Sequence, residues 1–268
     1  MSSIAAGQLA RVIIAMQPYV EEIVFVGGWV HALYLAEAND RCAVATEDID
    51  ITLPRVLLTR DRATLLELAA DAGFARDPIS DMPDVAAWMV YRNADGLTVP
   101  IDFLTEGEPR RPIEIVGQPG LKAQGYPGQQ MLLDSWQWMQ VDAALHPLLD
   151  PRRRIRVPTL GAYVMQKAMS ATMRGSRVKA AKDLVYLFEI LRHPRLGAVV
   201  APEIRALRER YPDEYEQYQA SLGAAHATQA TLRDVAEQVI EAGRAFGTVE
   251  GVAAAVDGRF RRLLAETA

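Results

Sequence analysis

The chain has 268 residues, half of them hydrophobic and 24% charged, which is typical of an ordinary globular protein. Its formal net charge of −5 argues against bulk affinity for nucleic acid, although it leaves room for a local basic patch. The single Cys42 excludes an internal disulfide, and no apolar run is long enough to span a bilayer. Because the N-terminus has no basic segment before its apolar residues, we expect a cytoplasmic protein with no membrane partner.

The first hundred residues predict alternating helices and strands. The helices are expected at residues 4–17, 29–37 and 60–73, and the strands at residues 23–26, 48–53, 85–91 and 97–104. The last two strands flank Asn93-Ala94-Asp95-Gly96, which has the composition of a hairpin turn. This order predicts an α/β (α+β) fold with a small mixed sheet.

The second half of the chain predicts mainly helices. Residues 107–128 are rich in glycine and proline and give no clear assignment, and a strand is expected at residues 154–157. The helices that follow are expected at residues 160–174, 178–192, 201–210, 228–246 and 249–264. We therefore divide the chain into a core at 1–106, a connecting region with strands at 107–158 and a helical domain at 159–268.

The most informative segment is Thr46 to Leu53, an apolar strand with acids at alternate positions. Side chains alternate faces along a strand, so Asp48 and Asp50 share one face while Ile49 and Ile51 enter the core. Two neighbouring carboxylates repel each other and favour a cation, and hard oxygen ligands suit Mg²⁺. A third acid, Asp102, lies on the strand at 97–104. The alternative for the Asp-x-Asp pair by itself is a solvated strand edge, because short motifs have many false matches.

The strand at 23–26 ends at Gly27-Gly28 and opens a helix. Such a turn presents backbone N–H groups at the positive end of a helix dipole and can hold a phosphate. The alternative is that the glycines serve only the geometry of a tight turn. Trp29, which follows them, either stacks on a base or packs the helix onto the sheet, and we favour packing.

Between Pro151 and Lys182 there are nine Lys or Arg residues and no Asp or Glu. The arginines at 152–154 and 156 form either a solvated edge or an RNA contact. Lys167 lies at helical spacing among apolar residues, so its ammonium needs a partner, which is either a triphosphate or the carboxylate of Asp183. Arg174 lies two turns further along the same face.

These motifs together resemble the nucleotidyltransferase superfamily with the DNA polymerase β-like fold. The signature of that superfamily is a glycine turn, an Asp-x-Asp pair and a third acid on a later strand, over roughly residues 20–105. The helical half is also similar to the AbiEii and MenT group of toxins and their uncharacterised relatives, where a helix lysine precedes an arginine and a Lys-Asp pair. The matching residues are Gly27, Gly28, Asp48, Asp50, Asp102, Lys167, Arg174, Lys182 and Asp183.

The resemblance implies transfer of a nucleoside monophosphate from an NTP to an acceptor. The three aspartates would be catalytic and would bind Mg²⁺, with Asp102 assisting the second metal or deprotonating the acceptor. The glycines and the helical Lys, Arg and Asp residues would bind the nucleotide, with Lys167 on phosphate in a cleft between the two domains. The chain departs from the superfamily pattern at Trp29, where a small hydroxyl residue is frequent, and in its longer spacing from Gly28 to Asp48.

Three functions remain open at this stage. The first is a Mg²⁺-dependent nucleotidyltransferase that acts as the toxin of a toxin–antitoxin pair on tRNA or protein, with a cognate antitoxin as partner. The second is a transferase that modifies a small molecule such as an antibiotic, which Gly27-Gly28-Trp29 favours. The third is a catalytically silent nucleotide-binding module of the same fold, because fold does not fix activity.

Overall fold

The computed structural model describes residues 3–40, 46, 48–77, 88–92, 98–150 and 152–268. The chain forms two compact units, of which one comprises Met1–Val30 and Thr46–Pro158 and the other comprises His31–Ala45 and Thr159–Ala268. The three-part division expected from the sequence stays a prediction. Cys42, the start of the strand expected at 85–91 and the hairpin turn at 93–96 lie outside the described residues.

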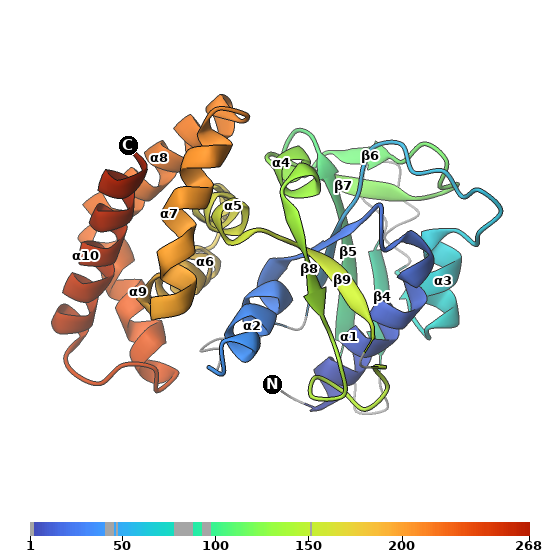
Figure 1. Ribbon diagram of the computed structural model, residues 1–268, viewed down its shortest axis with the longest axis horizontal. Helices are drawn as coiled ribbons and strands as arrows, with labels where there is room; N and C mark the ends of the chain where they lie inside the picture. The colour runs from blue at the N-terminus through green and yellow to red at the C-terminus, as the bar shows by residue number, and fades with distance from the viewer. Residues whose placement is uncertain (1–2, 41–45, 47, 78–87, 93–97, 151) are drawn as a thin grey trace. The chain divides into compact units, whose positions relative to one another are not determined.

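The first unit contains all the strands of the described residues (Figure 1). Its helices are α1 (Ser3–Ala15), α3 (Leu65–Asp71) and α4 (Gln129–Asp134), with a short 3₁₀ helix at Gln17–Tyr19. Helix α2 (Gly27–Glu37) begins in this unit and ends in the other. The strands are β1 (Val24–Val26), β2 (Ile49–Thr52), β3 (Ala75–Arg76), β4 (Trp88–Arg92), β5 (Thr98–Glu106), β6 (Pro112–Glu114), β7 (Lys122–Tyr126), β8 (Trp136–Gln140) and β9 (Arg154–Pro158).

Seven of these strands form one mixed sheet with the central order β1-β2-β5-β4-β3. Strands β2 and β5 are parallel, whereas β1 is antiparallel to β2 and β4 is antiparallel to β5. The later half of β5 also pairs in parallel with β7, and β6 pairs with β7. Strands β8 and β9 form a separate antiparallel hairpin. The small mixed sheet expected from the sequence is therefore confirmed.

Alternation along the two central strands of the sheet follows the sequence prediction. Ile49 and Ile51 on β2, together with Ile101 and Phe103 on β5, are each at most 1% exposed. A strand with one buried and one partly solvated face needs this period-two pattern, because successive side chains point to opposite faces. Asp102 lies at one of the positions between the buried residues and is only partly buried.

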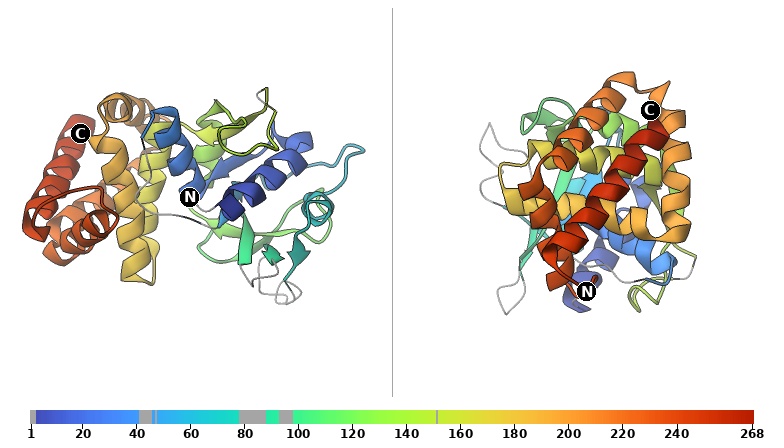
Figure 2. Two further views of the ribbon diagram at one scale, coloured as in Figure 1. Left: turned by 90° about the horizontal axis from the view of Figure 1, so that it is seen from below. Right: turned by 90° about the vertical axis from the view of Figure 1, so that its left-hand side faces the viewer.

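The second unit is a set of packed helices. They are α5 (Leu160–Met173), α6 (Arg177–Arg192), α7 (Pro194–Arg208), α8 (Pro212–Ala227), α9 (Gln229–Glu241) and α10 (Val249–Thr267). Helix α5 contacts α6, α7 and α8, and α10, red in Figure 2, contacts α9, α8 and α7. Buried aromatic residues such as Tyr163, Tyr186, Tyr218 and Phe260 fill this core. The mainly helical C-terminal region is thus confirmed.

Several helix boundaries differ from the sequence predictions. Helix α3 begins after Thr64 rather than at Arg60, because Arg60 and Asp61 have positive φ angles and Thr64 forms a capping box with Glu67. Helix α7 begins at Pro194 instead of Ala201 and continues through Pro202. Helix α8 was not predicted, since its buried face consists of tyrosine, leucine and alanine rather than a strongly apolar stripe.

Candidate functional site

Gly27 lies directly against the side chain of Asp50. Its φ angle is +76°, in the left-handed region that favours glycine. A Cβ atom added to Gly27 would lie 1.8 Å from Oδ2 of Asp50 and 2.8 Å from its Cγ. The antiparallel pairing of β1 with β2, in which Val26 opposes Asp50, creates this approach. The glycine at this position is therefore required both by backbone conformation and by the carboxylate that it faces.

Asp50 and Asp102 are register partners on the parallel strands β2 and β5. Partners in a parallel pair present their side chains on the same face of the sheet, so these two carboxyl groups lie side by side. Both residues are partly buried, whereas Asp48 is exposed immediately before β2. The structure thus brings together Asp50, Asp102 and Gly27, with Asp48 two residues upstream of Asp50. Their predicted catalytic and metal-binding roles stay predictions.

The chemistry of this face suits a hard divalent cation, because its donors are carboxylate oxygens. Within the described ranges, however, no three His, Cys, Asp or Glu side chains converge closely enough to form a metal-ligand group. Two adjacent carboxylates, those of Asp50 and Asp102, fit a cation that keeps other positions for phosphate oxygens or water. They do not resemble a closed structural site, in which four protein ligands surround the metal.

A second polar cluster lies between α5 and α6 in the helical unit. The Nζ of Lys167 donates to Oδ1 of Asp183 at 2.9 Å, and Nε of Arg174 donates to Oδ2 at 2.9 Å. The hydroxyl of Ser170 donates to the same Oδ2 at 2.8 Å. Lys167 and Asp183 are at most 5% exposed at their side chains, whereas the side chain of Arg174 is 37% exposed. Asp183 therefore fixes one buried and one accessible cation.

The charge state of this cluster follows from its partners. Burial by itself raises the pKa of Asp183, but the charges and hydrogen bonds of Lys167 and Arg174 outweigh it and hold that pKa below its ordinary value. The Nζ of Lys182 lies 5.9 Å from the centre of the Tyr186 ring, and that of Lys167 lies 5.4 Å from the same ring. Of the four predicted residues, three are thus joined by ion pairs and the fourth lies at a shared aromatic ring.

Sequence reasoning missed Ser170 and a buried network that begins at His31. Ser170 lies three residues after Lys167, a helical spacing that indicates a shared face. His31 Nε2 lies 2.8 Å from Glu189 Oε2, and both side chains are fully buried. Burial lowers the pKa of His31, although the hydrogen bond to Glu189 opposes this effect. Arg244 bridges Glu189 at 3.0 Å and Asp40 at 2.7 Å. No local motif connects residues so far apart in the chain.

Trp29 is 3% exposed, which fits the packing role that the sequence favoured. The basic stretch after Pro151 forms part of the β8–β9 hairpin. The guanidinium carbon of Arg154 lies 4.1 Å from the ring centre of Trp138, and that of Arg156 lies 3.8 Å from the ring centre of Trp136. These are cation–π contacts on one face of the hairpin. Whether this face also contacts RNA stays a prediction.

Comparison with protein families agrees with the geometry. A family model described as Nucleotidyltransferase matches residues 5–195, which include both polar clusters. A search of curated proteins finds no match. Among the described residues, no helix combines the length and the apolar character needed to cross a membrane. Because the family model covers more than half of the 268 residues, the chain belongs to the nucleotidyltransferase family and is an enzyme of nucleotidyl transfer.

Proposed function

We propose that this nucleotidyltransferase uses Mg²⁺ to move a nucleoside monophosphate from an NTP to an acceptor, with Asp48, Asp50 and Asp102 as its catalytic and metal-binding residues. The observation that carries this proposal is the register of Asp50 with Asp102 beside Gly27. Adjacent carboxylates repel each other unless a cation offsets their charge. A divalent cation bound there supplies charge neutralisation for the phosphates of the nucleotide.

The reaction places specific demands on the residues of the chain. An acceptor oxygen attacks the α-phosphorus of the NTP, the new P–O bond forms, and the bond to the leaving oxygen breaks, which releases pyrophosphate. The proton of an acceptor hydroxyl needs a base, and we assign Asp102 this role or that of a second metal ligand. Asp48 and Asp50 would hold the cation, which would neutralise charge on the triphosphate. The backbone at Gly27 and Gly28 provides N–H groups for a phosphate.

The helical cluster supports the binding of nucleotide phosphates. We propose that Lys167, Arg174, Lys182 and Asp183 form this part of the machinery, with Asp183 holding the cations in place. Lys167 is buried and paired with Asp183, so it would act on a phosphate indirectly. It holds the carboxylate of Asp183 in place, and its positive charge contributes to the local electrostatic field. Arg174 is the more exposed cation, and a guanidinium can bind a phosphate through two parallel hydrogen bonds. Lys182, which is only partly buried, adds a further charge.

We further propose that the acceptor is tRNA or a protein, and that the enzyme acts in the cytoplasm as the toxin of a toxin–antitoxin pair. The basic stretch from Arg152 to Lys182 supports an RNA acceptor, because it contains no acidic residue. A cognate antitoxin would then be expected to block transfer. An antibiotic-modifying transferase and a silent nucleotide-binding module are the alternatives that the following assay separates.

The test is incubation with each α-labelled NTP, Mg²⁺ and total tRNA. Wild type should label RNA, while Asp48→Ala/Asp50→Ala and Asp102→Asn should lose transfer. Removal of Mg²⁺ with a chelator should have the same effect. Asp71→Asn, which changes an exposed acid on α3, serves as the matched control and should retain full transfer. Full activity of Asp102→Asn would show that this residue is not part of the catalytic site. In a parallel incubation with an added aminoglycoside, label on the aminoglycoside but not on RNA would favour the small-molecule function.

A further inference from the structure

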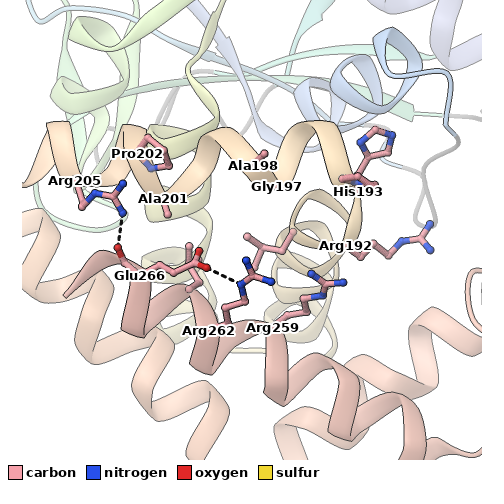
Figure 3. A pocket seen from close by; sticks show the side chains of 13 residues that line it. Arg192, His193, Gly197, Ala198, Ala201, Pro202, Arg205, Arg259, Arg262 and Glu266 are labelled. Carbon is pink, nitrogen blue, oxygen red and sulfur yellow. Dashed lines mark hydrogen bonds and ion pairs between the residues drawn. The ribbon is translucent and has the colours of Figure 1, made fainter.

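A pocket in the second unit is lined by four arginines and one acid. It has a volume of about 560 Å³ and lies where the end of α6, one side of α7 along most of its length and the later part of α10 meet. The charged residues that line it are Arg192, Arg205, Arg259, Arg262 and Glu266. Four positive charges and one negative charge give a local excess of +3, in a chain whose net charge is −5. Figure 3 shows Arg259 and Arg262 extending from α10 toward α7.

The middle of the α7 side of the pocket is made of small residues. Gly197, Ala198 and Ala201 line it, so no large side chain fills the space in front of this part of the helix. Gly197 has a packing reason of its own, because a Cβ there would lie 2.7 Å from the carbonyl oxygen of Leu191. The first turn of α7 also lines the pocket through His193 and Pro194. The N-terminus of this 15-residue helix adds partial positive charge to that of the arginines.

The arginines are only weakly committed to partners inside the protein. Arg262 pairs with Glu266 at 2.6 Å, but both are exposed and four residues apart on one helix, so solvent screens the pair and it contributes little. Arg205 donates to the backbone oxygen of Glu266 at 2.6 Å. Arg192 reaches Asp40 only at 3.4 Å. Within the described ranges, Arg259 makes no hydrogen bond or ion pair of its own. Guanidinium groups are thus available to an external anion.

The lining also indicates what kind of anion fits. Guanidinium groups bind phosphate oxygens with matched geometry, and the lining contains no Phe, Tyr or Trp ring on which a base could stack. Its one imidazole, that of His193, accepts a hydrogen bond from the backbone N–H of Leu196 at 3.3 Å. The side chain of Arg262 is 68% exposed, so the pocket is open, whereas sites for small ligands bury most of the ligand surface. An open, arginine-rich surface without a base platform suits a sugar–phosphate backbone that runs across it.

We propose that this pocket binds the phosphodiester backbone of a nucleic acid, independently of base sequence. Residues 197–266 lie beyond the segment 5–195 that the family model matches, so the nucleotidyltransferase assignment does not account for them. The proposal rests on the proposed function only in naming RNA, the acceptor considered above, as the physiological source of the phosphates. It gives the C-terminal helices a role in holding the acceptor.

The test is a binding assay without NTP or Mg²⁺, so that its outcome is separate from catalysis. Fluorescently labelled tRNA and a single-stranded DNA of about 20 nucleotides are titrated with wild type and with Arg259→Ala/Arg262→Ala at several salt concentrations. Loss of two exposed phosphate contacts should weaken both ligands about tenfold at about 0.1 M salt. The slope of log K against log salt should fall by about 1.4, at about 0.7 for each phosphate contact of a single strand.

The matched control is Arg233→Ala/Arg261→Ala, which removes the same charge from two arginines of similar exposure, 63% and 66%, that do not line this pocket. This control should change affinity less than twofold, and circular dichroism should show that both double variants fold. Equal weakening by both double variants would indicate a general charge effect and would overturn the proposal. Unchanged nucleic-acid binding by Arg259→Ala/Arg262→Ala would overturn it as well. So would a result in which this double variant differs from wild type only in how well free ATP or inorganic phosphate competes with the labelled nucleic acid.

Discussion

Replacing Gly27 with alanine tests the geometry on which the proposed active site depends. The substitution adds one methyl group at a backbone position with a φ angle of +76°, and that methyl group would lie 1.8 Å from Oδ2 of Asp50. The two effects differ in origin. The backbone strain belongs to residue 27 alone, whereas the steric clash requires the carboxylate of Asp50. A double-mutant cycle can therefore separate them.

The size of each effect follows from the geometry. An alanine held in the left-handed region costs about 1–2 kcal/mol. Forcing Asp50 or the adjoining backbone to move adds about 1–3 kcal/mol, as for overpacking in a tight interior. We therefore expect Gly27→Ala to lower the free energy of unfolding by about 2–5 kcal/mol. In the Asp50→Ala background the carboxylate is gone and only the Cβ of residue 50 remains, 3.0 Å away, so the cost should fall to about 1–2 kcal/mol.

The assay is equilibrium unfolding in urea at pH 7, followed by circular dichroism, for the four proteins of the cycle. Asp50→Asn supplies a further background with the same shape and no charge. If the clash is steric, Gly27→Ala should cost as much in the Asp50→Asn background as in the wild-type background. Equal costs in the wild-type and Asp50→Ala backgrounds would refute the reasoning, because the carboxylate would then not be what the methyl group meets. Retained transfer activity in Gly27→Ala would likewise show that Asp50 need not occupy this position.

Three further predictions concern the helical unit. Lys167→Met should lower the free energy of unfolding by about 3–5 kcal/mol, because it leaves the charge of Asp183 buried without its lysine; urea unfolding should show that the added substitution Asp183→Leu recovers most of this loss. Since the pKa of Asp183 lies below its ordinary 3.8, its stabilisation should be fully present above about pH 4 and disappear as the pH falls through the folded-state pKa, an effect that Asp183→Asn should lack. The pKa of His31, which faces Glu189, Lys167 and Arg244, lies below its ordinary 6.5, so stability should decline as the pH falls from 6.5 toward the folded-state pKa. His31→Gln should flatten this decline in unfolding curves measured between about pH 7.5 and 5.5, and an unchanged pH dependence would contradict the assignment.

Local patterns in the sequence predicted the two strands that carry Asp50 and Asp102. Alternation of apolar and acidic residues placed Ile49 and Ile51 in the core, and the glycine pair marked the end of β1. The pairing of β2 with β5 could not be derived in this way, because register is a long-range property set by the whole sheet. Local patterns indicated two strands that each carry an acid, and only the fold shows that Asp50 and Asp102 are register partners on neighbouring strands.

The helical half was predicted less completely for a related reason. A helix is recognised by an apolar stripe, and α8 buries Tyr215, Tyr218 and Leu222 among residues that are otherwise polar or small. Tyrosine is ambiguous in sequence, since its ring packs in cores while its hydroxyl suits solvent. The buried network of His31, Glu189 and Arg244 joins positions whose separation in the chain conceals them from any motif.

The position of Lys167 connects the two interpretations that its sequence context left open. A lysine among apolar residues was expected to meet either a triphosphate or a carboxylate, and it donates to Asp183. That carboxylate also accepts from Ser170 and from Arg174, whose side chain is 37% exposed. A salt bridge that is structural at Lys167 can therefore be functional at Arg174, because the buried pair fixes the orientation of the accessible guanidinium. Under the proposed function, loss of the buried lysine should therefore mainly lower stability, and loss of the exposed arginine should mainly lower affinity for phosphate.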